Sequence, residues 1–288
     1  MRNLVCMELR KALRNGWFFA SLAVGCLIAL ASAARSVEAF FMYGFASFDA
    51  ERYFQLSTSG TVCAWIGIGR LDTTFLPWLF YGIVPLLAVV PYAWSYRSEA
   101  SSGYIAQVCT RASFGCYMGA KFFAAFVTAG CSIAIPLVLN YLVVACFIPA
   151  YVPDPGEGLS VPIEEHYPFS ALFFTCPLAY AVLYTALDFF LCGSWAVVVC
   201  AASFFVRNRV VLLVGSYVLQ YFLRYCNTTG VAERLFGTAG AYQLSLISMA
   251  WPVPSGDVPH AGIAVALGCA GLAIALLALR VVGRRDVA

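Results

Sequence analysis

The sequence predicts an all-α, polytopic membrane protein with six transmembrane helices. Hydrophobic residues make up 62% of the 288 residues and charged residues only 11%, whereas a soluble domain is about 25% charged. Apolar runs of roughly 18 residues, long enough to cross a bilayer, recur along the chain. Within one transmembrane domain covering residues 1–288, we expect spans at about 17–34, 74–95, 122–148, 186–206, 210–225 and 261–279.

Residues 1–16 are basic and amphipathic, and they predict an interfacial helix that leads into the first span. On a helical wheel, apolar and charged residues occupy opposite arcs: Val5, Leu9, Ala12 and Leu13 on one, and Glu8, Arg10, Lys11 and Arg14 on the other. A signal peptide is the alternative, because the run 17–34 ends in residues that resemble a cleavage site. We favour a retained helix, since the run is long for a signal peptide and a cleaved segment needs no amphipathic order.

The segment 35–73 is expected to form a loop at headgroup level, because its charges nearly balance and it is rich in aromatic residues. The second span that follows contains Pro77, Pro85 and Pro91. Proline kinks a membrane helix where neighbours or water satisfy the freed carbonyl. The kink fits a transport pathway or a simple packing bend.

A polar island from Glu99 to Lys121 separates the second and third spans. Its apolar residues at i, i+1, i+4 and i+5 form one stripe of a short surface helix: Tyr104, Ile105, Val108 and Cys109. Thr110, Ser113 and Gly115 then predict a turn, and Lys121 stands where the next apolar run begins. A plain solvated loop is the alternative interpretation.

Two polar residues inside later spans are candidates for a pathway. Asn140 lies in the third span, where an amide more often makes an interhelical hydrogen bond than binds substrate. Asp188 lies in the fourth span, and counting back from Arg207 places it just inside the outer membrane boundary. There it could snorkel or face a vestibule, while residues 169–185 project outward or break at Pro177.

Basic residues set the expected orientation. They cluster before the first span, in the island, in the tight turn 207–209 and after the last span, whereas the acidic, proline-rich loop 149–168 falls on the other side. The positive-inside rule then places both termini in the cytoplasm of a multi-pass protein of the cell membrane. The net charge of +3 is too small to indicate nucleic acid.

Several chemistries lack their sequence signatures. There is no phosphate-binding G-x-x-x-x-G-K-[ST], no His-Glu-x-x-His and no Cys-x-x-Cys. We therefore expect no ATP site, no metal, no cofactor and no enzymatic activity in this chain. Cys63 and Cys226 are both expected outside and could pair.

The order Glu99, Gly103, Thr110-Arg111, Ser113 and Lys121 resembles permease subunits of type-2 ATP-binding cassette exporters. In that family an acidic residue and a glycine follow the second span, then a short helix, a Thr/Ser turn with basic residues, and a lysine that opens the third span. The turn proline of the family is absent here, and Arg111 stands alone.

The resemblance implies a coupling helix within 97–117 that binds a separate ATPase subunit. The implied coupling residues are Glu99, Gly103, Tyr104, Thr110, Arg111 and Lys121. Glu99 and Arg111 would make charged contacts with the ATPase, and Gly103 would allow close approach. A second permease chain, identical or homologous, would complete a pathway that exports a peptide, a drug or a lipid-like molecule. The resemblance also implies helices within 227–260 that dip back into the outer leaflet.

An autonomous secondary carrier or intramembrane enzyme is the alternative. Such proteins carry paired ionisable residues near the membrane midplane and often internal repeats. This sequence offers only Asp188 and no evident repeat, so the permease is favoured.

Overall fold

The chain folds into a bundle of helices. The computed structural model describes residues 2–44, 60–66, 75–150, 152–153, 163, 167–231, 234, 245–252 and 261–285. Its helices are α1 (Arg2–Leu13), α2 (Gly16–Gly44), α4 (Thr61–Ala64), α5 (Phe75–Val89), α6 (Ser95–Ser101), α7 (Tyr104–Cys109), α8 (Phe114–Phe147), α9 (Ser170–Thr175), α10 (Pro177–Ala202), α11 (Arg209–Thr228), α13 (Leu246–Ala250) and α14 (Ala261–Arg285).

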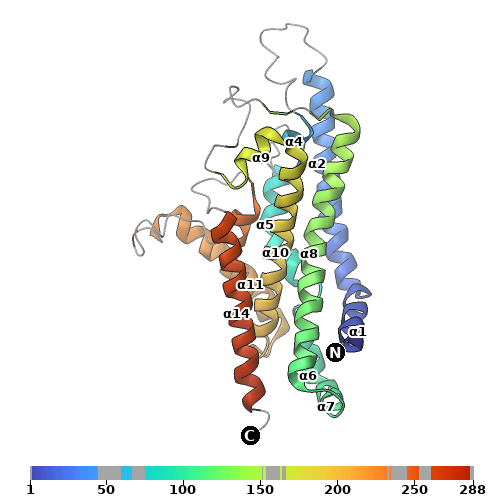
Figure 1. Cartoon of the computed structure of the whole chain (residues 1–288), viewed down its shortest axis with the longest axis vertical. Coiled ribbons are helices and arrows are strands. Elements are labelled where there is room, and N and C mark those ends of the chain that lie inside the picture. Colours follow the sequence, from blue (N-terminus) through green and yellow to red (C-terminus); the bar gives the residue numbers. More distant parts are fainter. Residues whose placement is uncertain are drawn as a thin grey trace.

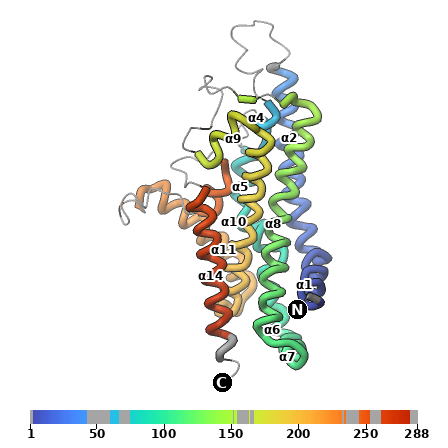
Figure 2. Tube along the Cα trace, in the orientation of Figure 1, coloured from blue at the N-terminus to red at the C-terminus, as the bar shows by residue number. Residues whose placement is uncertain are grey.

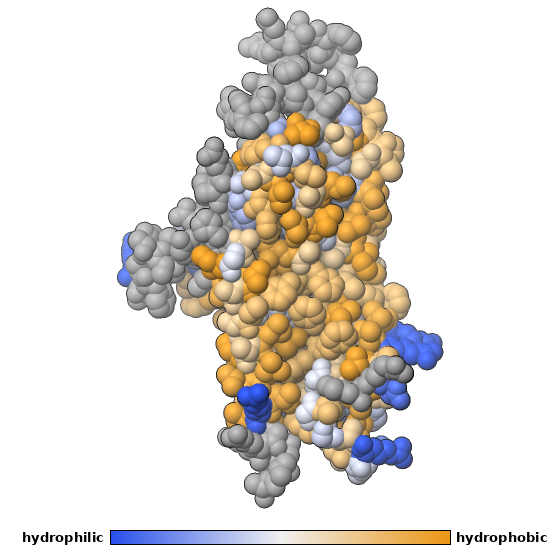
Figure 3. All heavy atoms as spheres, in the orientation of Figure 1, coloured by the Kyte–Doolittle hydropathy of each residue, from blue (hydrophilic) through white to orange (hydrophobic). Residues whose placement is uncertain are grey.

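Four of the described helices are long and apolar enough to cross a membrane. These stretches are Gly16–Met42, Phe114–Phe147, Pro177–Ala202 and Ala261–Val282. The other two expected spans fall on α5, of 15 residues, and on α11, of 20 residues, which includes Ser216, Gln220 and Arg224. Apolar side chains dominate the middle of the visible surface, and the most hydrophilic ones gather mainly at its lower end (Figure 3). The all-helical, membrane-type architecture is therefore confirmed, with four candidate spans among the described helices, and the count of six stays a prediction.

Helices α8 and α10 form the centre of the bundle. Helix α8 packs against α2 on one side and α10 on the other, and α10 also packs against α14. Helix α5 contacts α2, α8, α10 and α11. The short helices α6 and α7 follow α5 and lie at the lower end, beside the start of α8 and near α1 (Figures 1 and 2).

Paired glycine and phenylalanine residues bring the central helices close together. A Cβ at Gly130 of α8 would lie 2.5 Å from the ring of Phe189 of α10, and one at Gly193 of α10 would lie 2.7 Å from the ring of Phe126 of α8. Glycine at such positions lets two membrane helices approach closely. The reciprocal arrangement fixes how α8 and α10 sit against each other.

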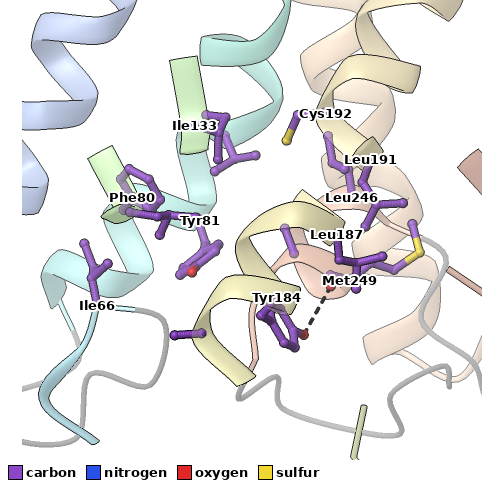
Figure 4. Close-up of a cluster of buried hydrophobic side chains, with 14 of the residues drawn as sticks. Ile66, Phe80, Tyr81, Ile133, Tyr184, Leu187, Leu191, Cys192, Leu246 and Met249 are labelled. Carbon is purple, nitrogen blue, oxygen red and sulfur yellow. Dashed lines mark hydrogen bonds between the residues drawn. The ribbon is translucent and has the colours of Figure 1, made fainter. Parts of the chain in front are cut away.

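The largest buried cluster joins α5, α10 and α13 (Figure 4). Residues from α10 and α13 meet there, and the Tyr184 hydroxyl donates a hydrogen bond of 3.4 Å to the Met249 carbonyl. Helix α13 is buried along its whole length, and its first amide, of Leu246, donates to Gln220 Oε1 of α11 at 2.8 Å. This short helix is therefore an integral part of the bundle.

Several helix boundaries differ from the sequence predictions. Helix α2 continues to Gly44, so residues 35–44, expected in a loop, are helical. Helix α8 begins at Phe114, before the expected start near 122. Helices can extend beyond an apolar run because polar residues are tolerated where a helix leaves the membrane, and hydropathy alone does not mark that end.

Other predictions for the upper part of the chain have mixed outcomes. The break at Pro177 is confirmed, because α9 ends at Thr175 and α10 begins at Pro177. Trp65, expected among headgroup-level aromatics, is instead buried and donates from Nε1 to the Leu137 carbonyl at 3.1 Å. Cys226 is a free thiol, so the considered pair with Cys63 is not formed. Residues 45–59, 67–74 and 253–260, and most of the acidic loop, lie outside the described residues.

Candidate functional site

Four charged side chains meet where α1 packs against α8, and one of them comes from α6. We call Glu8, Lys11, Glu99 and Lys121 the charge cluster. Lys121 and Glu8 are completely buried, and Lys121 Nζ lies 3.1 Å from Glu8 Oε2 and 2.8 Å from Glu99 Oε2. Lys11 Nζ pairs with Glu99 Oε1. Two acids and two bases thus balance, which offsets the cost of removing each charge from water.

Tyrosine side chains complete this cluster. The Tyr92 hydroxyl donates to Glu8 Oε2 at 2.6 Å, and the Tyr117 hydroxyl donates to Glu99 Oε2. Lys121 Nζ also lies 5.0 Å from the centre of the Tyr92 ring and 5.2 Å from that of Tyr117, within the range of cation–π attraction. Buried charges that are paired and hydrogen-bonded in this way hold their helices in one arrangement.

Lys11 links the cluster to α7. Its side chain is 45% exposed, and Nζ lies 4.8 Å from the centre of the Tyr104 ring at the start of α7. One lysine of α1 therefore contacts both the last turns of α6, through Glu99, and the first turn of α7.

Electrostatics keep the pair between Lys11 and Glu99 ionised. Burial by itself raises the pKa of Glu99, but the Lys121 ammonium, helped by hydrogen bonds from Lys11, Lys121 and Tyr117, holds the pKa below its usual value. Burial likewise lowers the pKa of Lys11, and the hydrogen bond and charge of Glu99 raise it above its usual value overall. Both groups are charged at neutral pH.

The turn between α6 and α7 depends on Gly103. Its φ of 74° lies in the left-handed region that favours glycine. A Cβ there would meet nothing within 4 Å, so the described chain uses this glycine for its backbone conformation. At the other end of α7, the Thr110 hydroxyl donates to the Gln107 carbonyl at 2.7 Å.

A surface hollow opens between α1 and α7. Its volume is about 610 Å³, and it is lined by Leu4, Met7, Tyr104, Gln107, Val108, Thr110, Arg111 and Ala112. The walls are mixed: apolar side chains from both helices stand beside the exposed Arg111. We call this the α1–α7 hollow. Its combination of apolar and charged residues suits contact with another protein.

The structure therefore divides the expected coupling residues into two groups. Glu99 and Lys121 lie together in the charge cluster, while Tyr104, Thr110 and Arg111 line the α1–α7 hollow. Glu99 was expected to make a charged contact with a partner, yet it is 7% exposed and faces α1 and α8. The Glu99 carboxylate is directed toward these helices because both of its basic partners, Lys11 and Lys121, lie on them.

Asn140 bridges three segments. Its Oδ1 accepts from the Ile66 amide at 2.9 Å, and its Nδ2 donates to the Ala29 carbonyl of α2 at 2.7 Å. The side chain is completely buried. These bonds support the interhelical interpretation of this residue over a ligand role.

Asp188 is the second of the two pathway candidates. It lies near the middle of α10 and is completely buried, so it does not reach the surface. Helix α10 begins at Pro177, well before the expected start of this span near 186. Neither carboxylate oxygen has a hydrogen-bond partner within the described chain, and the hydroxyls of Tyr81 and Tyr180 are likewise unpartnered.

Half of the charge cluster was not predicted from the sequence. Glu8 and Lys11 were assigned to the water-facing arc of an interfacial helix, and Tyr92 and Tyr117 were not singled out. An available signal was the i, i+4 spacing of Glu8 and Ala12, which places this carboxylate on the same face of α1 as a buried alanine. A lysine beside an apolar run, matched by nearby acids, was a second signal.

The chain matches no protein-family model and no curated protein. Among the described residues, no group of three or more His, Cys, Asp or Glu side chains is arranged to hold a metal ion. Each charged side chain of the cluster is paired with another of its members, although Glu8 Oε1 has no hydrogen-bond partner within the described chain. This pairing suits holding helices together.

Proposed function

We propose that this chain is the transmembrane permease subunit of an ATP-driven exporter of the type-2 ATP-binding cassette class. The observation that carries the proposal is the junction of α1, α6, α7 and α8. The charge cluster ties α1 and α6 to α8, and the α1–α7 hollow lies next to it. A force applied at α7 would thus reach a membrane-spanning helix through buried ion pairs.

In this proposal the ATPase is a separate subunit that docks on the α1–α7 hollow. Arg111 makes the charged contact, and Leu4, Met7 and Val108 supply apolar contacts. Glu99 and Lys121 transmit motion within the chain, while Gly103 sets the angle between α6 and α7. The chain itself binds no ATP and acts as no enzyme.

The remaining partners follow from the same class. A second permease chain, identical or homologous, completes the pathway, and lipid surrounds both. Six spans, with α5 and α11 as the second and fifth, would leave both termini in the cytoplasm. Both described chain ends, at α1 and α14, lie at the end of the bundle that carries α6 and α7 (Figure 1), which supports this topology. The substrate class is a peptide, a drug or a lipid-like molecule.

A second candidate is an autonomous secondary carrier, favoured by one observation. Asp188 is an unpartnered carboxyl group in the middle of a candidate span, and such residues commonly serve transport. Within the described chain its carboxylate has no basic partner, so it lacks the paired charges typical of such carriers.

The test is affinity purification of the tagged full-length chain from its native membrane in mild detergent, followed by mass spectrometry. We expect an ATP-binding cassette subunit in about equal amount. Changing Arg111→Glu should reduce its recovery, whereas Arg14→Glu, an exposed change outside the hollow, should not. Recovery of the intact chain without any ATPase, while other membrane complexes survive, would contradict the proposal and favour the carrier.

A further inference from the structure

Three arginines from separate segments line one hollow at the lower end of the bundle. Arg97 comes from α6, Arg207 from the turn after α10, and Arg209 from the start of α11. The hollow has a volume of about 530 Å³, and Ser101, Asn208 and Val210 complete its lining. We call it the arginine hollow. Its lining carries three positive charges and two polar side chains able to donate hydrogen bonds.

Local contacts hold these arginines in place. Arg97 Nε donates to the Arg207 carbonyl at 2.9 Å, which joins α6 to the turn before α11. Asn208 Oδ1 accepts from the Val210 amide at 2.9 Å and so caps α11 directly beside Arg209. The Arg209 guanidinium lies 5.5 Å from the centre of the Trp94 ring. The convergence is therefore built by the fold.

No acid within the described chain neutralises the arginine hollow. Its three arginines form no ion pair with a described carboxylate, and Glu99, two residues from Arg97, is turned toward Lys11 and Lys121. Three like charges around one space repel one another unless an anion enters it. Arginine forks suit phosphate oxygens in particular, because they can form two parallel hydrogen bonds.

The surroundings indicate where that anion comes from. Apolar side chains beside the arginines are strongly exposed: Phe205 is 66% exposed, Val210 65% and Val211 57%. The exposed apolar face continues along α11 through Val214 and Val218. An amphiphile could therefore lay its acyl chains on α11 while its headgroup occupies the hollow.

We propose that the arginine hollow binds the phosphate of an anionic membrane lipid. Basic pockets between helices at the membrane surface bind such headgroups. The inference does not depend on the proposed transport function, since any multi-pass protein could use such a site. It assigns Arg97, Arg207 and Arg209 to the phosphate, and Phe205 and α11 to the acyl chains.

The test is a titration of the purified full-length chain in detergent with phosphatidylglycerol or phosphatidylcholine, read by native mass spectrometry. We expect one tightly bound phosphatidylglycerol. The double change Arg207→Gln/Arg209→Gln should weaken that binding by about 25-fold, because each arginine near an anionic headgroup contributes roughly a factor of five. Phosphatidylcholine binding should not change.

The matched control is Arg10→Gln/Arg14→Gln, which removes the same charge from exposed positions in the last turn of α1 and in the turn after it. An equal loss of phosphatidylglycerol binding in both double variants would show that the lipid is attracted to the basic surface in general, and it would overturn the proposed site. Unchanged phosphatidylglycerol binding in Arg207→Gln/Arg209→Gln would overturn it as well. Displacement of the lipid by millimolar inorganic phosphate would assign the hollow to a free anion instead. The unchanged chain and Arg207→Gln/Arg209→Gln should have equal melting temperatures in phosphatidylcholine. A lower melting temperature of the variant would attribute its loss of lipid binding to a folding defect and overturn the assignment of these arginines to lipid contact.

Discussion

Replacing Lys121 by methionine should lower the free energy of unfolding by about 3–5 kcal/mol. This is the usual cost of removing one partner from a buried ion pair, because the remaining charge keeps its desolvation penalty and loses its compensation. Here two carboxylates, Glu8 and Glu99, depend on the same ammonium group. Thermal and denaturant unfolding of the purified chain in detergent, followed by tryptophan fluorescence, measures the loss.

Two further variants separate ion pairing from general damage at this junction. Lys11→Met should cost at most about 1 kcal/mol, because the Lys11 side chain is 45% exposed and solvent screens its pair. Adding Glu8→Gln and Glu99→Gln to Lys121→Met should recover much of the loss, since no buried charge then lacks a partner. Equal effects of Lys121→Met and Lys11→Met would show that the cluster does not hold α1 and α6 to α8.

Asp188→Leu should raise the free energy of unfolding, whereas Asn140→Leu should lower it. Both residues are completely buried, but Asn140 has partners on both sides of its amide and Asp188 has none within the described chain. Losing the Asn140 side chain leaves the buried Ile66 amide without its acceptor, at about 1–3 kcal/mol. Removing an unpartnered carboxyl relieves a penalty of similar or larger size.

The same pair of variants reports on function. A buried, unsatisfied polar group that costs stability is a feature of sites retained for activity. If Asp188 serves transport, Asp188→Asn should keep or raise the melting temperature while ATP-dependent export falls. A lower melting temperature of Asp188→Leu in detergent would instead mean that the carboxyl group is satisfied in the folded protein.

The sequence was sufficient to predict a helical membrane protein and the short helix within the polar island. The stripe of Tyr104, Ile105, Val108 and Cys109 matches α7, and the helix break at Pro177 was predicted correctly. These features depend on local hydropathy and on backbone chemistry, both of which are visible in a single sequence.

The buried charges could not be predicted in the same way. Glu8 and Lys121 are 113 residues apart in sequence, and only the packing of α1 on α8 brings them together. The amphipathic pattern placed Glu8 on the polar arc of its helix. The sequence of that helix alone does not distinguish a polar arc that faces water from one that faces another buried polar group. The start of α10 was predicted wrongly because the length of this span was inferred from charge positions.

The measurement that tests the central claim most directly is site-specific photo-crosslinking in the native membrane. A photoreactive residue at Gln107, which lines the α1–α7 hollow, should crosslink to an ATP-binding cassette subunit. The same residue at Leu178, exposed at the opposite end of the bundle near the start of α10, should not. Absence of an ATPase adduct at Gln107, or equal adducts at both positions, would contradict the account.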